Sequence, residues 1–131
     1  PRLSYRGVEP SAYAVKRFGR RRNLAQGAFA DLPRLDLGGP FDLVICADVM
    51  HYLGELELAA GLPALVRATG GLAYLELLTS DEEVEGDQRA LKLRPPSFYR
   101  KLFSSAGLTG VGCHGWLGPE LADLPAALER R

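Results

Sequence analysis

The residues around Glu9 have the types and order that sugar recognition needs. Glu9 follows the apolar Val8 and precedes Pro10 and Ser11, where a turn and a helix begin. A carboxylate has two oxygens and can accept hydrogen bonds from two neighbouring hydroxyl groups. The same carboxylate could instead interact favourably with the positive N-terminus of the helix. The residues alone leave both interpretations open.

A second chemically capable segment is Asp48-Val49-Met50-His51, which directly follows an apolar stretch. An unperturbed imidazole titrates near pH ~6.5, so His51 is the candidate general base of the chain. The alternative is a packed histidine at the start of a helix. No metal site is expected, because Cys46, His51, Cys113 and His114 lack the paired spacing of zinc ligands.

Composition limits the classes of function. The chain has 131 residues with 16 Lys+Arg and 16 Asp+Glu, so its net charge is zero. A neutral chain argues against nucleic-acid and membrane partners. The basic run at 20–22 complements the negative end of a preceding helix; an RNA-binding patch is the alternative, but no aromatic residues interleave with these arginines. Two cysteines and no leader or membrane-spanning run favour a cytoplasmic protein.

The elements that must position these residues alternate between strands and helices. Residues 41–47 are apolar without alternation, which is typical of a parallel strand buried on both faces. We therefore predict one domain over 1–131, a three-layer α-β-α sandwich with a mostly parallel sheet. The expected strands are 3–8, 24–29, 41–47, 72–78 and 108–116, and the expected helices are 11–19, 56–68 with a kink or break at Pro63, 96–106 and 121–131.

Five segments, in this order and spacing, resemble the class I S-adenosylmethionine-dependent methyltransferases. The resemblance runs from about Tyr5 to Leu108. The family has a Rossmann-like fold, and the resemblance implies S-adenosylmethionine as cofactor and a small molecule as methyl acceptor. The segments are Gly7-Val8-Glu9-Pro10-Ser11, residues 41–53 (FDLVICADVMHYL), 65–72 (LVRATGGL), 99–102 (YRKL) and 105–108 (SAGL).

The resemblance also implies a role for each candidate residue. The family's usual acid near adenine is replaced here by an alanine, for which Asp31 three residues later is a candidate substitute. The loop after Leu78 would face the acceptor. The implied cofactor residues are Glu9 and Pro10 at the ribose, Ala28 and Phe29 beside the adenine, and Asp48, Val49 and Met50 around the methionine portion, with His51 at the mouth of the pocket.

The largest departure from the family lies before Glu9, where its first strand, glycine-rich loop and first helix have no counterpart. By resemblance, the missing strand lies between the strands at 5–8 and 41–47. An empty central slot is not stable, because each buried unpaired backbone group costs ~1–3 kcal/mol. The slot could be filled by a longer N-terminus or by a second chain in a homodimer, or the flanking strands could pair directly and lose the cofactor site.

Two functions remain open from the sequence. The first is methyl transfer to a small molecule by in-line displacement, which needs mainly correct positioning of the acceptor. The second is a methyltransferase-like module without catalysis that serves assembly. Glu9 and the 41–53 segment favour the first, whereas Ala28 and the absent glycine-rich loop favour the second.

Overall fold

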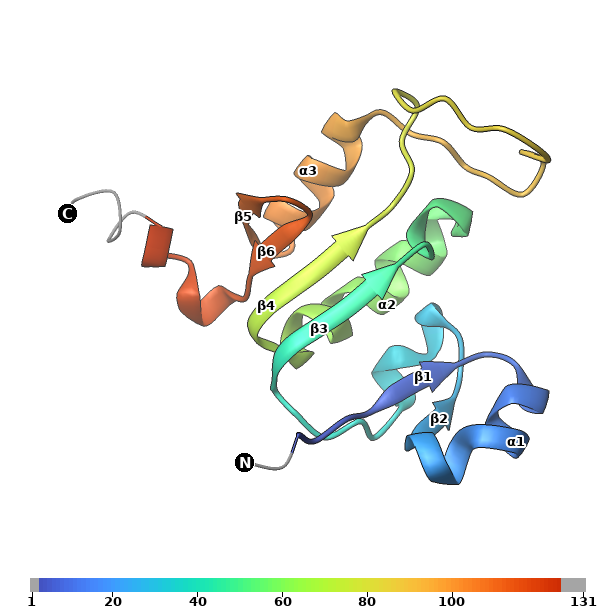
Figure 1. Ribbon diagram of the computed structural model, residues 1–131. Helices are drawn as coiled ribbons and strands as arrows, with labels where there is room; N and C mark the ends of the chain where they lie inside the picture. Colours follow the sequence, from blue (N-terminus) through green and yellow to red (C-terminus); the bar gives the residue numbers. More distant parts are fainter. Residues whose placement is uncertain (1–2, 126–131) are drawn as a thin grey trace.

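A computed structural model describes residues 3–125, and its strands form two sheets (Figure 1). The first sheet has two parallel strands. The second has four strands in the order β3-β4-β6-β5, in which β3 and β4 are parallel and the last two strands run antiparallel to their neighbours. The strands are β1 (Gly7–Glu9), β2 (Leu24–Gln26), β3 (Phe41–Ala47), β4 (Thr69–Glu76), β5 (Thr109–Gly112) and β6 (Gly115–Leu117).

The mixed α/β class of the expected fold is confirmed, and β3 has the predicted bounds. The three-layer sandwich around one mostly parallel sheet is not shown, because the described strands form two sheets and the larger one is mixed. Direct pairing of the strands that flank the expected slot is not observed. Within residues 3–125, β1 pairs only with β2, and β3 pairs only with β4. One edge of β1 and one edge of β3 therefore have no strand neighbour in the described part of the chain.

The single strand predicted over 108–116 is wrong. This segment is a hairpin, and its tip is Cys113-His114 with positive φ angles of 50° and 60°. Glycines flank the tip on both sides, and Gly112 has a φ of 90°, so the sequence did carry a turn signal that the single-strand prediction overlooked. The two side chains consequently belong to a turn and not to opposite faces of one strand.

The first helix, α1 (Ala12–Arg22), begins as predicted and ends later. The Ser11 hydroxyl accepts a hydrogen bond from the Ala14 N–H at 3.2 Å, which confirms the expected N-cap. Gly19 is not the end of the helix. The helix continues to Asn23, whose left-handed backbone (φ 48°) donates an N–H to the Gly19 carbonyl. The arginines at 20–22 occupy the last turn, where they complement the helix dipole.

The second and third helices close one face of the larger sheet. Pro63 neither breaks nor divides α2 (Glu55–Ala68), which is one helix, and α3 (Pro96–Ser105) begins at its predicted proline. A Cβ at Gly61 would lie 2.3 Å from the Phe29 carbonyl oxygen, so glycine permits the close approach of α2 to the preceding segment. Three short 3₁₀ helices complete the structure: η1 (Phe29–Arg34), η2 (Met50–Tyr52) and η3 (Pro119–Leu121).

The helix predicted over 121–131 falls mostly outside the described residues.

The core lies between the layer formed by α2 and α3 and strand β4. The buried apolar side chains are Phe29, Met50, Leu58, Leu62, Leu65, Val66, Ala73, Leu75, Leu77, Tyr99, Phe103 and Leu108.

The opposite face of the larger sheet is uncovered. On β3, Leu43 is 53% exposed and Ile45 is 66% exposed, and their register partners on β4 are Leu72 and Tyr74. The prediction that both faces of β3 are buried is therefore wrong. Apolar side chains predict burial, but the described residues place helices of the core on only one side of this strand.

Candidate functional site

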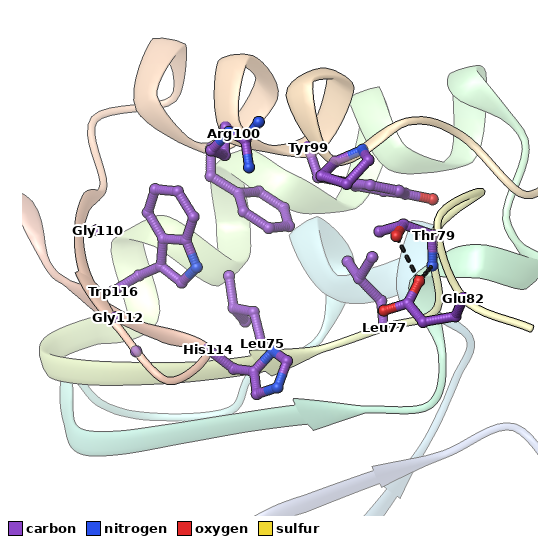
Figure 2. A pocket seen from close by; sticks show the side chains of 13 residues that line it. Leu75, Leu77, Thr79, Glu82, Tyr99, Arg100, Gly110, Gly112, His114 and Trp116 are labelled. Atoms are coloured by element: carbon purple, nitrogen blue, oxygen red, sulfur yellow. Dashed lines mark hydrogen bonds between the residues drawn. The ribbon is translucent and has the colours of Figure 1, made fainter.

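The carboxyl ends of β1 and β3 define the candidate site. Both figures show the two strands beside each other with their arrowheads at the same end (Figures 1 and 2). The chain continues from β1 to its partner β2 on one side, and from β3 to its partner β4 on the other. Within residues 3–125 the two strands belong to separate sheets, so no reversal of strand order within one sheet is shown. In open α/β sheets, ligands bind beyond the carboxyl ends of the strands where strand order reverses, which makes these two strand ends the candidate ligand site.

Glu9 is the last residue of β1 and is half-buried. One carboxylate oxygen, Oε1, accepts a hydrogen bond from the Ser11 N–H at 2.8 Å, while Pro10 is exposed between them. This contact satisfies a donor near the first turn of α1. The other oxygen, Oε2, has no hydrogen-bond donor within residues 3–125. Of the two carboxylate oxygens that were predicted to accept from a ribose, only Oε2 is therefore free to do so.

The segment after β2 is occupied by local contacts. Asp31 accepts the Ala28 N–H at 2.9 Å through Oδ2 and forms an ion pair with Arg34 through Oδ1. The Ala28 N–H first, and then Arg34, hold the pKa of Asp31 below its ordinary value of 3.8. Ala28 is exposed, whereas Phe29 is buried against α2. As placed, Phe29 belongs to the core, and Asp31 closes the turn that begins η1.

The segment after β3 divides into an exposed and a buried part. Asp48 has a left-handed backbone (φ 58°), donates its N–H to the Glu76 carbonyl at 3.1 Å, and exposes 75% of its side chain. Val49 is partly exposed, whereas Met50 is fully buried in the core. Asp48 and Val49 are therefore the residues of this segment that a ligand could contact directly.

His51 is fully buried and connects the ends of two strands. Its Nδ1 accepts a hydrogen bond from the Leu78 N–H at 3.0 Å, and its carbonyl accepts the Lys92 N–H at 2.7 Å. Its Nε2 lies 3.1 Å from Asp48 Oδ1, but the contact lacks hydrogen-bond geometry, so Nε2 has no partner in the described part of the chain.

These contacts determine what the imidazole can do. Because Nδ1 accepts from an N–H, the proton of a neutral His51 ring belongs on Nε2. In this arrangement Nε2 is a donor beside the Asp48 carboxylate and cannot accept a proton. The catalytic role expected for His51 stays a prediction. It requires the ring to move from its buried position, where its present role is structural.

The structure also assembles a cavity that was not predicted from the sequence. It has a volume of about 410 Å³ and lies between α3, β4 and the β5–β6 hairpin (Figure 2). Its polar residues include Thr79, Glu82, Arg100 and His114. One signal was present in the sequence: Thr79 and Glu82 have the Ser/Thr-x-x-Glu spacing of a reciprocal capping pair. The other two residues come from distant elements.

Histidine, cysteine and acidic side chains are the residues that could ligate a metal ion, and the cysteines could also act as thiol nucleophiles. Within 3–125, no group of three or more His, Cys, Asp or Glu residues could hold a metal ion. Burial raises the pKa of the Cys46 thiol to about 11, so this thiol stays protonated at neutral pH, while Cys113 is exposed.

Among the described residues, no helix combines the length and the apolar character that a membrane span requires.

No family model, curated protein or solved structure matches this chain.

Proposed function

We propose that the chain forms part of an S-adenosylmethionine-dependent methyltransferase domain that acts on a small molecule. The observation that supports the proposal is the position of Glu9 and Asp48 at the carboxyl ends of β1 and β3, two strands that point the same way in Figure 1. The resemblance of the sequence to class I methyltransferases assigns the cofactor to the same two residues. The placement of the two strands and the sequence resemblance thus point to the same part of the molecule, the carboxyl ends of β1 and β3.

The facing edges of β1 and β3 extend the proposal. A strand inserted between them would pair with both edges and unite the two sheets into one Rossmann-like sheet. The order would then be β2-β1-inserted strand-β3-β4-β6-β5. Such a strand would satisfy the unpaired edge groups, and the turn after it would lie at the carboxyl ends with Glu9 and Asp48. The strand would come from additional polypeptide or from a second chain.

The residues present fit part of the cofactor. Glu9 would accept from the ribose through Oε2, and Asp48 with Val49 would contact the methionine portion. Ala28 has no side-chain acceptor for the adenine amino group, and both oxygens of Asp31 are already engaged. When bound, S-adenosylmethionine supplies an activated methyl group. The chain's contribution is to hold the cofactor and to exclude water while the acceptor attacks in line.

The test is a titration of the protein with S-adenosylhomocysteine, read by calorimetry and by the melting temperature. We expect saturable binding, which Glu9→Gln weakens about tenfold, because a charge-assisted hydrogen bond contributes ~1.5–3 kcal/mol. Glu120→Gln, an exposed acid on η3, should leave binding unchanged. Equal binding by wild type and Glu9→Gln would remove Glu9 from the site.

The second candidate is a methyltransferase-like module without catalysis. It is favoured by the unpaired edges of β1 and β3, which are templates for pairing with another chain. Concentration-dependent association in analytical ultracentrifugation, together with no response to S-adenosylhomocysteine, would support this candidate over the first.

A further inference from the structure

The cavity beside α3 is lined by aromatic and aliphatic side chains. Leu75 and Phe103 are each 2% exposed, and Tyr99 is 3% exposed. The Phe103 and Trp116 rings meet edge to face with their centroids 5.1 Å apart, and Leu77 extends the same wall. Figure 2 shows Leu75, Leu77, Tyr99 and Trp116 around a shared space. An apolar cavity of about 410 Å³ is large enough for one small ring compound.

A single carboxylate stands at one end of this wall. Glu82 Oε2 accepts hydrogen bonds from both the N–H and the hydroxyl of Thr79, and Figure 2 marks them with dashed lines. These bonds leave Oε1 without a hydrogen-bond donor within residues 3–125. The hydrogen bond from the Thr79 side chain, more than any other contact, lowers the pKa of Glu82, so the carboxylate is ionised at neutral pH.

The hairpin tip forms the other end of the cavity. His114 lines it, and its carbonyl accepts the Leu75 N–H at 2.9 Å, which fixes the tip to β4. Both Cys113 and His114 have left-handed backbones, which a two-residue hairpin turn requires of its central residues.

We propose that this cavity binds a small aromatic or aliphatic amine, with its apolar body against Phe103 and Trp116 and its ammonium group at Glu82 Oε1. Charge complementarity selects this class, because a carboxylate at the same position would face an ionised acid. Arg100 lines the cavity from α3 but is exposed, and no ion pair joins it to Glu82 in the described part of the chain. His114 also lines the cavity with its imidazole near Glu82, but no ion pair joins it to Glu82 in the described residues either, so Glu82 Oε1 is the acceptor offered to an ammonium group.

This inference goes beyond the proposed cofactor site, although Thr79 and Glu82 belong to the loop after Leu78, which the resemblance places at the methyl acceptor. None of the cavity-lining residues is among those assigned to S-adenosylmethionine, which lie at the ends of β1, β2 and β3. The two sites can therefore be tested on the same protein, and either can fail without the other.

Trp116 makes the test direct, because the chain has one tryptophan and it lines the cavity. Phenethylamine, whose ring does not absorb at tryptophan excitation wavelengths, is titrated while Trp116 fluorescence is recorded. We expect a saturable change with phenethylamine and none with 3-phenylpropionate, which carries a carboxylate on the same ring and chain. An equal response to both compounds would overturn the proposal.

Variants then assign the ammonium contact. Glu82→Gln should weaken phenethylamine binding about tenfold, whereas the neighbouring exposed acid changed in Glu83→Gln should leave it unchanged. Since Glu82→Gln also alters the Thr79 contact, its melting curve is recorded, and S-adenosylhomocysteine is titrated as a second readout. Weaker amine binding by a folded Glu82→Gln protein supports the site. Unchanged amine binding removes Glu82 from it.

Discussion

The N-terminal region (β1, α1 and β2) and the C-terminal region (β3 to β6 with α2 and α3) are built from the same alternation of strands and helices but differ in burial. The C-terminal region contains a contiguous core in which Phe103 is 2% exposed. In the N-terminal region, Phe18 is 44% exposed and Tyr13 is 68% exposed, and Gly19 is the one buried residue of α1. The two regions thus share the same order of strands and helices, but they differ in how much apolar surface their side chains bury.

The difference also bears on function. The candidate cofactor residues stand between the two regions, with Glu9 on the weakly buried side and Asp48 on the well-buried side. A ligand that contacts both residues would connect the regions. The following predictions test this contrast, beginning with the largest expected effect.

Phe103→Ala should destabilise the protein by ~3–5 kcal/mol, since it removes a fully buried aromatic ring from the core. Phe18→Ala, the matched change in the N-terminal region, should cost well under half as much because its ring is largely solvated. Urea denaturation followed by circular dichroism measures both. Equal losses would show that the N-terminal region is as tightly packed as the core, and would remove the contrast.

His51→Phe should cost ~1–3 kcal/mol, because it leaves the Leu78 N–H without its acceptor. His51→Asn places an amide oxygen near the position of Nδ1 and should retain that hydrogen bond. Hydrogen exchange of the Leu78 amide separates the two variants: protection should fall in His51→Phe and persist in His51→Asn. Loss of protection in both variants would mean that the imidazole acts on Leu78 through packing alone.

Asp31 lies in the segment that joins the two regions. The lowered pKa of its carboxyl group predicts a small dependence of folding stability on pH. Its pKa is lowered in the folded state, so its contribution to stability is present above the unfolded pKa of about 3.8 and is lost as pH falls below it. Asp31→Asn should therefore lose less stability than wild type between pH 5 and pH 3. Midpoints of urea unfolding measure this difference, and exposed Asp36→Asn serves as the control. Parallel pH profiles for wild type and Asp31→Asn would contradict it.

Local signals in the sequence predicted most of the elements. The apolar run of β3, the Ser11 cap and the proline at the start of α3 are decided by side-chain chemistry within a few residues. Gly19 was predicted to end the helix, but it lies inside α1. Glycine is present there because the position is buried, and an added Cβ would lie close to the Val15 side chain and the Leu24 carbonyl oxygen. The hairpin at Cys113-His114 is flanked by Gly112 and Gly115, a turn signal that the prediction of one continuous strand overlooked.

The candidate site was predicted in part. Glu9 and Asp48 were identified because strand ends can be read from apolar runs. Phe29, Met50 and His51 were also selected, and the structure buries all three, since proximity in sequence to a strand end does not determine which side chains turn inward. The cavity at Glu82 escaped notice because its walls come from β4, α3 and the hairpin, which are separated in the chain.

The sequence by itself determined where most strands and helices form and which acids follow strand ends, because these properties depend on near neighbours. Only the tertiary structure decided that β1 and β3 each keep an edge without a strand partner within residues 3–125, that one face of β3 is exposed, and that Nδ1 of His51 accepts the Leu78 N–H. Each of these depends on contacts between segments far apart in the chain. Such contacts are fixed by the shape of the whole molecule, which no local pattern encodes.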